Sequence, residues 1–376
     1  MRKATTALAF TLALALPLSG CTLSVYNSYR DIESLKVVQA IGLDLSEDGS
    51  VVLSAATGPD ASGREPLRIT QEGTSLDAAM RSAEELSGGG SLFFSGTGAI
   101  VLGEDAALET SRWLDALARS KQLRLDNELY VLRGKKASTF IAGDNAPEDV
   151  FADLDSLAKR ISEYGPAPAT ICAGVSRSLL SSGAALITAI ELEEGALGTL
   201  TAVPAGFAVI SDGGLIGWLD DDEALGAGFF LGGPGLSVVE LETVTVELSG
   251  AEVTVEPVWE GDKLSRLDIH LAVNCSVIEA RAGSNFDSQE SWDAIERELA
   301  GKAMSWLESA LERSIELEAD FLGLGRQVQT SHPLKFDAMP ESWEQLFPDL
   351  DYKLSGEAKI LNMREYVRSP YPEVET

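Results

Sequence analysis

Residues 18–21 of this chain, Leu-Ser-Gly-Cys, are the place where residue types and spacing indicate the most specific chemistry. They follow a basic start, Arg2 and Lys3, and an apolar run of about 12 residues, shorter than the roughly 20 that cross a bilayer. Such a run is typical of a secretory signal peptide. Leu-Ser-Gly-Cys at its end has the pattern of the bacterial lipoprotein box, in which the cysteine thiol receives a diacylglyceryl group and becomes the mature N-terminus. We therefore expect a signal peptide over residues 1–20 and a lipid on Cys21.

The alternative for this motif is an ordinary signal peptide with a chance cysteine at the cleavage site. Lipidation is favoured because cysteine occurs only 3 times in 376 residues, and one copy stands where the box requires it. A single acyl chain holds a protein to a membrane only marginally, whereas two or more anchor it stably. The modification predicts a protein that is tethered to the bilayer.

The charge of the chain excludes several kinds of partner. Asp and Glu number 59 against 29 Lys and Arg, which gives a formal net charge of −30. Binding to nucleic acid requires clustered Lys and Arg to neutralise phosphates, and electrostatic binding to an anionic membrane uses basic patches. We see neither and expect no nucleic-acid partner. With 45% hydrophobic and 23% charged residues the chain is nevertheless typical of a folded protein.

The remaining thiols and both histidines offer little for catalysis. Cys172 and Cys275 could form one disulfide, but Cys275 falls on the apolar face of an alternating strand, which favours a buried free thiol. His270 lies on the opposite face of that strand, and His332 lies in a loop. A general base needs a positioned partner, and none is visible for either histidine. We expect structural roles for both.

Two short motifs resemble known binding loops only in part. Asp44, Ser46 and Asp48 match the start of a calcium loop, but its twelfth position is Ala55 where a bidentate Glu is needed, so we interpret the segment as a hairpin turn. Residues 323–325, Gly-Leu-Gly, follow a helix rather than a strand and are interpreted as a helix stop, not a nucleotide loop. With 59 acids, no single carboxylate pair is informative. We therefore predict no catalytic residue, metal or cofactor.

The elements that position these residues alternate between strands and helices in the first half. The predicted elements are a hairpin over 36–57, a helix that starts with a capping box at 74–77, a buried strand at 99–102, a helix at 105–120, a strand at 128–132 and a helix at 147–164. Residues 165–190 carry one charge, Arg177, and are expected to form buried or inter-domain packing. We expect a mixed sheet-and-helix region over residues 21–200, either one unit or two subdomains.

The second half has a different pattern. The predicted elements are a hairpin over 206–219, a short helix from 220 to 230, strands at 237–248, 251–258 and 265–279, a long helix over 288–321 and a final strand at 350–354. Apolar residues of the long helix recur in steps of three and four, as one helix face requires. We expect residues 201–376 to form an antiparallel sheet packed on a long helix. The fold class is α+β with more than one domain.

With these segments in order, the chain resembles the Ger(x)C family, the lipoprotein C subunits of nutrient germinant receptors in endospore-forming bacteria. The resemblance covers nearly the whole mature chain and depends on the order and spacing of its pieces together with the lipoprotein box. The matching pieces are residues 30–32 and 40–44, 92–96 and 100–104, 124–131, 206–209 and 215–219, 319–325, 332–333 and 343–348. The family often has Trp-Asp after the lipidated cysteine, where this chain has Thr22-Leu23.

The resemblance implies a subunit that is not an enzyme. It would be acylated at Cys21, lie on the outer face of the spore inner membrane, and assemble with the A- and B-type membrane subunits of the receptor to trigger germination. Two other classes stay open. A lipid-anchored solute-binding protein would need a cleft between two similar α/β lobes, and an extracytoplasmic hydrolase would need a focused carboxylate or histidine site.

Overall fold

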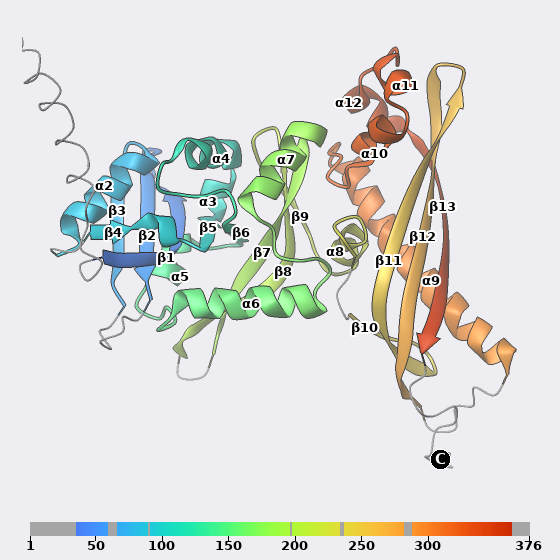
Figure 1. Cartoon of the computed structure of the whole chain (residues 1–376), viewed down its shortest axis with the longest axis horizontal. Coiled ribbons are helices and arrows are strands. Elements are labelled where there is room, and N and C mark those ends of the chain that lie inside the picture. Colours follow the sequence, from blue (N-terminus) through green and yellow to red (C-terminus); the bar gives the residue numbers. More distant parts are fainter. Residues whose placement is uncertain are drawn as a thin grey trace, which may run out of the picture.

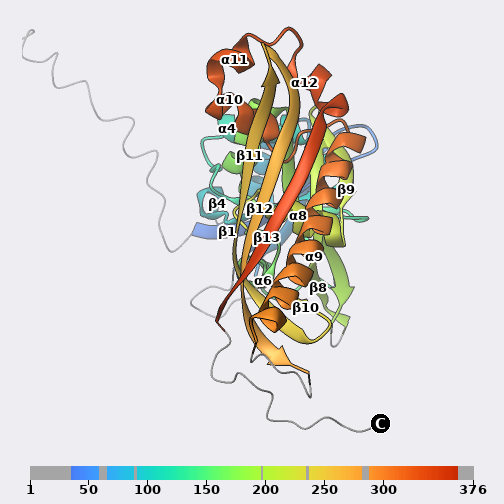
Figure 2. The same cartoon turned by 90° about the vertical axis from the view of Figure 1, so that its right-hand side faces the viewer.

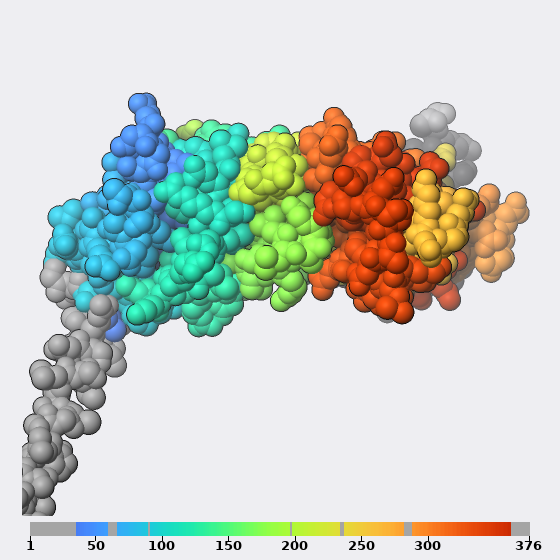
Figure 3. All heavy atoms as spheres, turned by 90° about the horizontal axis from the view of Figure 1, so that it is seen from above, coloured from blue at the N-terminus to red at the C-terminus, as the bar shows by residue number. Residues whose placement is uncertain are grey.

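The computed structural model describes residues 35–58, 66–88, 91–195, 198–233, 237–281 and 288–362. The expected signal peptide over residues 1–20 and Cys21 lie outside these residues. The described part is elongated, with the chain progressing from one end to the other as two bodies side by side (Figures 1 and 3). Among the described helices, none is both long enough and apolar enough to cross a membrane.

The first body is built on a large mixed sheet, which has 9 strands among the described residues. Its strands are β1 (Leu35–Leu45), β2 (Val51–Thr57), β3 (Arg68–Gly73), β4 (Ser91–Phe93), β5 (Ala99–Gly103), β6 (Glu128–Leu132), β7 (Ala184–Glu194), β8 (Leu200–Ser211) and β9 (Gly214–Leu219). The order is β3-β2-β1-β5-β6-β7-β8-β9, with β4 paired to β1. The central strands β1, β5, β6 and β7 run parallel, and antiparallel hairpins extend the sheet at both ends.

Helices cover both faces of this sheet, and the sequence of the central strands explains why. In β5 the residues Ile100 and Leu102 pack under one set of helices, while Ala99 and Val101 pack under another. A strand buried on both faces must be continuously apolar, as this one is. One face carries α2 (Leu76–Leu86), α3 (Glu104–Ala107), α4 (Thr110–Arg119) and α7 (Cys172–Ser182); the other carries α5 (Ala137–Ile141) and α6 (Val150–Tyr164).

Most elements expected in this half are confirmed, including the helix whose N-cap Ser75 accepts a hydrogen bond from the amide of Ala78. The single helix expected over 105–120 is instead two helices, α3 and α4. Side chains satisfy the carbonyls at the end of α3: Trp113 Nε1 donates to Ala106 O at 2.7 Å, and Thr110 Oγ1 donates to Ala107 O at 2.7 Å. These bonds replace intrahelical ones and allow the break.

The second body is a sheet of 4 strands among the described residues, in the order β10 (Val238–Glu240), β11 (Val244–Glu260), β12 (Lys263–Ala280) and β13 (Asp351–Asn362). The expectation of an antiparallel sheet is wrong for its last strand, since β13 runs parallel to β12. The reason is the connection between them. The long helix α9 (Gln289–Glu316) and three short helices carry the chain back across the sheet (Figure 2), and such crossovers join parallel strands.

Helix α9 packs its apolar face on this sheet as its periodicity predicts. The buried residues of that face are Ile295, Leu299, Ala303, Trp306, Leu307, Ala310 and Leu311. The helix ends at Glu316 rather than near 321, because Glu318 adopts a left-handed φ of 49°. Gly323 is not a helix stop as expected: it is the N-cap of the next helix, with a φ of 72° that favours glycine.

Most of the remaining short elements lie at the junction or beside α9, whereas the 3₁₀ turn Phe94–Gly96 lies next to β1. They are α8 (Asp221–Gly228), α10 (Leu324–Ser331), α11 (Pro333–Asp337), α12 (Trp343–Leu346) and the 3₁₀ turns Phe94–Gly96 and Phe347–Asp349. Helix α8 crosses α9 so closely that a Cβ on Gly226 would lie 1.9 Å from the carbonyl oxygen of Trp306. This contact fixes the connection between the two bodies.

A continuous apolar core joins the bodies. Along one face of β7, Ile190 packs under α6, whereas Leu186 joins the same cluster of buried residues as α9 and the second sheet. Phe207 of β8 and Leu219 of β9 belong to that cluster too. The second body therefore covers the end of the first sheet in place of another helix (Figure 1).

Candidate functional site

The described cysteines and histidines do not form a site. Cys172 and Cys275 are free and buried, and burial raises the pKa of their thiols to about 12 and about 11. His270 is exposed on β12, as expected, with Nδ1 3.0 Å from Ser355 Oγ. The ring of His332 lies 6.1 Å from that of Trp259. The structural roles expected for both histidines stay a prediction.

The segment with a partial calcium-loop match is a hairpin turn. Asp44 points away from the turn and accepts hydrogen bonds from the amides of Ala137 at 2.6 Å and Ser138 at 2.8 Å, so it caps helix α5. Burial raises the pKa of Asp44, while these two bonds oppose the rise. Asp48 instead bonds within the turn, and the Ser46 hydroxyl helps to lower its pKa to about 2. Among the described residues, no group of three or more His, Cys, Asp or Glu is placed to hold a metal ion.

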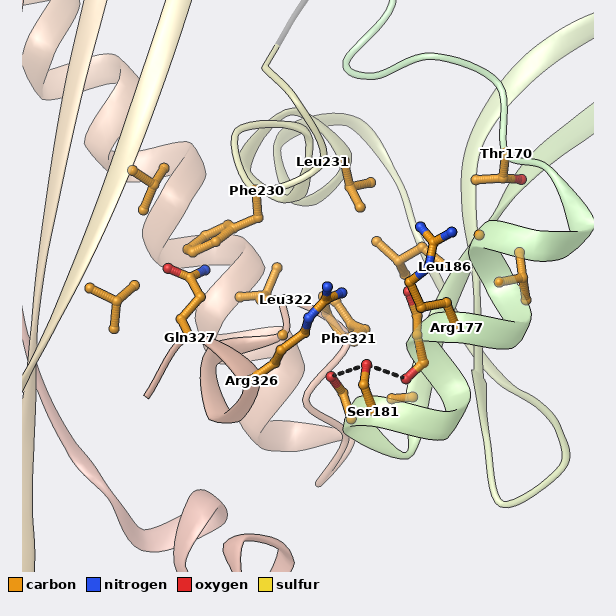
Figure 4. A pocket seen from close by; sticks show the side chains of 18 of the residues that line it. Thr170, Arg177, Ser181, Leu186, Phe230, Leu231, Phe321, Leu322, Arg326 and Gln327 are labelled. Atoms are coloured by element: carbon orange, nitrogen blue, oxygen red, sulfur yellow. Dashed lines mark hydrogen bonds between the residues drawn. The ribbon is translucent and has the colours of Figure 1, made fainter. Parts of the chain in front are cut away.

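A large hollow lies between the two bodies (Figure 4). It has a volume of about 810 Å³, within the usual range of small-molecule sites. One wall is α7 with the start of β7, and the other is β11, α10 and the residues after α8. We call this hollow the interbody cavity. Its apolar lining includes Leu186, Phe230, Leu231, Val255, Phe321 and Leu322.

The charge of the interbody cavity is opposite to that of the chain as a whole. Its described lining contains two arginines, Arg177 of α7 and Arg326 of α10, and no Asp or Glu. Both arginine side chains extend into the space between the bodies (Figure 4). Unlike Arg133, which pairs with Asp220, neither has an ion pair in the described part of the chain. The cavity is therefore a locally basic site in an acidic protein.

A buried carboxylate fixes the wall that carries Arg326. Asp320 accepts hydrogen bonds from the amides of Leu324 at 2.8 Å and Gly325 at 2.7 Å, and from Trp343 Nε1 at 3.0 Å. Burial raises the pKa of Asp320, and these donors act against that rise. The three bonds tie the first turn of α10 to α12. Arg326 follows directly on this turn, so its backbone is held in place.

The facing wall is fixed by backbone bonds at the start of α7. The amide of Cys172 donates to Asn127 O at 3.1 Å, and the amide of Ala173 donates to Leu125 O at 2.8 Å. Cys172 is completely buried beneath the helix. Helix α7 therefore rests on the first body at its N-terminus and presents Arg177, about one and a half turns further on, to the cavity.

From the sequence, one wall of this cavity was predicted, and only as a segment that packs between domains. The low charge of residues 165–190 predicted packing between domains and singled out Arg177, and this segment does line the boundary. Neither helix α7 nor Arg326 was predicted. Little in the sequence pointed to Arg177 and Arg326 as a pair. Lys and Arg together number 29, and these two arginines lie about 150 positions apart.

The fold and this cavity define a class: a two-body α+β protein in which a helix-covered mixed sheet is joined to a second sheet packed on one long helix. Comparison with family models identifies the class. Residues 28–192 match the model described as spore germination protein N-terminal domain, and residues 205–364 match that described as spore germination B3/GerAC like, C-terminal. The chain belongs to the Ger(x)C family of spore germination proteins, as its sequence resemblance indicated.

Individual relatives agree with this assignment. Spore germination protein KC of Bacillus subtilis (strain 168) is 21% identical over 373 residues, which cover 88% of this chain and 90% of the relative. The crystal structure of the GerBC protein superimposes with a TM-score of 0.54 at 18% identity, covering 86% of this chain and 97% of that one. At this identity the superposition shows a shared fold, and it agrees with the predicted multi-domain α+β class.

The division of the chain near residue 200 stays a prediction. The two family models meet between residues 192 and 205, on either side of that position. The hydrogen-bonded sheet of the first body, however, continues through β8 and β9 to Leu219. The C-terminal match therefore begins within the first sheet, and we propose that the two family regions share it.

Proposed function

We propose that this protein is the lipid-anchored C subunit of a spore nutrient germinant receptor. It would assemble with the A- and B-type membrane subunits on the outer face of the spore inner membrane, and it would act without catalysis of its own. The observation that carries the proposal is the pair of germination-family matches, which follow one another over residues 28–192 and 205–364. The relative from B. subtilis, which aligns along 90% of its length, supports it.

The lipid anchor on Cys21 is the second part of the proposal. A net charge of −30 gives an anionic bilayer no electrostatic reason to hold the protein, so attachment needs another source. Thirteen residues separate Cys21 from β1, which begins at Leu35, and at ~3.3 Å per residue they reach at most roughly 45 Å. The anchor would keep the first body near the membrane, within reach of membrane-embedded partners.

The proposal is tested by deletion of the gene in the source organism and complementation of the deletion. Spores that lack the protein should lose the response to at least one nutrient, and the unchanged gene should restore it. A Cys21→Ala copy should fail to restore the response and should leave the membrane fraction. Normal germination on every nutrient, in a strain that lacks paralogues as well, would contradict the receptor role.

Assembly with the A- and B-type subunits needs its own measurement. The complete chain, carrying an affinity tag at its C-terminus, should co-purify both membrane subunits from detergent-solubilised spore membranes. The Cys21→Ala chain should recover less of both, because it is no longer concentrated at the bilayer. Recovery of the tagged protein without either subunit, under conditions that keep the two subunits together, would argue against a common complex.

A further inference from the structure

We propose that the interbody cavity binds a small organic anion that has a carboxylate at one end and an apolar body. The proposal concerns the cavity alone and goes beyond the receptor role. It depends on three properties of the described lining: unpaired cationic donors, an apolar surface beside them, and no acidic side chain.

Arg177 and Arg326 supply the charge. They extend into the cavity from α7 and α10, on facing walls (Figure 4), and have no ion pair within the described residues. The planar guanidinium group donates two parallel hydrogen bonds to a carboxylate, which makes arginine the preferred partner of that group. Gln327, next to Arg326 on the same wall, adds an amide without a hydrogen-bond partner among the described side chains.

Three hydroxyl groups of the lining already have acceptors within their own helices. Ser181 donates to Ser178 O at 3.3 Å, Thr330 donates to Arg326 O at 2.7 Å, and Ser331 donates to Gln327 O at 2.9 Å. With their protons used inside their own helices, these groups offer the cavity only oxygen lone pairs. The charge that attracts an anion therefore comes from the two arginines, and the Gln327 amide can add a hydrogen bond.

The apolar surface beside the arginines indicates that the rest of the ligand is apolar. Phe230 and Leu231 form the end of the cavity next to α8, and Phe321 and Leu322, just before α10 in the chain, belong to the wall that carries Arg326 (Figure 4). Leu231 is 37% exposed, a large apolar side chain left open to solvent at the cavity. Covering such a surface contributes about 25 cal/mol per Å² of area removed from water. A ligand with an apolar body would gain this energy and a bare inorganic anion would not.

The lack of an acidic side chain in the described lining also predicts what the cavity rejects. An ammonium group that enters would be desolvated beside two guanidinium groups without a carboxylate to pair with. A net anion should therefore bind better than a zwitterion of the same shape. This distinguishes the proposed ligand class from free amino acids.

The experiment uses the complete lipidated chain in non-ionic detergent, titrated calorimetrically at fixed ionic strength. The probe is 3-phenylpropionate, compared with 3-phenylpropanamide, phenylalanine and inorganic phosphate. We expect one site for 3-phenylpropionate, with each comparison compound weaker by about tenfold or more, the equivalent of about 1.4 kcal/mol. Arg177→Gln and Arg326→Gln should each weaken the probe by a similar factor and leave the melting temperature unchanged.

Arg160→Gln is the matched control. Arg160 on α6 has no ion pair within the described residues and lies away from the interbody cavity, so its replacement should leave probe binding unchanged. Retention of full binding by the Arg177→Gln/Arg326→Gln double variant would overturn the proposal, because the probe would then be in the micelle or at another site. Equal binding of the amide or of phenylalanine would overturn it as well, and so would a lack of binding by 3-phenylpropionate.

Discussion

At the scale of single residues, Asp320 holds together the wall of the interbody cavity that carries Arg326. Its carboxylate is 4% exposed and receives three N–H donors, two from the first turn of α10 and one from Trp343. A Cβ on Gly325 would lie 2.6 Å from the Trp343 ring, so α10 and α12 meet closely at this point. Sequence alone could mark Asp320 as an acid before a Gly-Leu-Gly segment but not its burial, which depends on the position of a tryptophan 23 residues later.

We predict that Asp320→Asn lowers the free energy of unfolding by about 2–3 kcal/mol, since an amide NH₂ group would face N–H donors that need an acceptor. Chemical denaturation followed by circular dichroism measures the change. Asp337→Asn, at an exposed position of α11, is the matched control and should change stability by less than about 0.5 kcal/mol. Equal effects of the two substitutions would show that the three bonds to Asp320 contribute little.

The thiols give a second prediction at this scale. Protein extracted from the native membrane should show no thiol that reacts with a disulfide reagent at pH 8 while folded, because burial keeps Cys172 and Cys275 protonated. In guanidinium chloride it should show two. The third cysteine, Cys21, would be blocked by its lipid, so a count of three from processed protein would refute the proposed modification.

The same thiols predict a decline of stability in alkali. Their folded pKa values, about 12 and about 11, lie above the ordinary value of 9.0, so the folded state holds these protons more tightly than the unfolded state. This contribution is complete below pH 9 and is lost as the pH rises toward 11. Cys275→Ala should reduce the slope of unfolding free energy against pH in this window. An unchanged slope would assign the alkaline decline to other groups.

At the scale of elements, we expect the replacement of glycine by alanine to have opposite effects on stability in two adjoining helices. Gly226→Ala in α8 forces a Cβ toward the Trp306 carbonyl of α9, and we expect a loss of about 1–3 kcal/mol from overpacking. Gly301→Ala, on the exposed side of α9 where nothing lies within 4 Å, should stabilise the protein by up to about 1 kcal/mol, because alanine is the better helix former. Denaturation midpoints of the two variants measure both signs. A neutral Gly226→Ala would mean that α8 can move away from α9.

The elements also show which features were predictable from sequence. The strand 99–102 follows from a short continuous apolar run, and the apolar face of α9 follows from its periodicity. The direction of β13 does not, because strand pairing depends on the path of the chain between two strands, and residues 281–350 contain that path. Helix α7 was missed because its mixture of serines and small residues resembles a loop. The interbody cavity combines both difficulties, since its walls come from α7 and from the crossover segment.

At the scale of the whole molecule, the interbody cavity differs in charge from the chain that surrounds it. The molecule is elongated (Figure 3) and has a net charge of −30, whereas the described lining of the interbody cavity is basic. The cavity also lies where the two bodies meet, at the boundary that a relative movement of the bodies would deform. A ligand there would contact both α7 and α10 and would favour one arrangement of the bodies over another.

A ligand can influence the arrangement of the two bodies only if they are joined by packing rather than by a linker. The apolar core that they share allows a test of this condition. Phe207 is 1% exposed in the cluster shared with α9, and Leu53 is buried in the first body, away from that cluster. Phe207→Ala should cost about 3–5 kcal/mol and Leu53→Ala about 2–5 kcal/mol. If the shared core makes the bodies unfold as one unit, both substitutions should speed amide hydrogen exchange in β5 and in β12 alike. Mass spectrometry of peptides from each strand measures the two exchange rates separately. Acceleration by Leu53→Ala that stops within the first sheet would show instead that the bodies open separately, and that the shared core is too weak to transmit a change from one to the other.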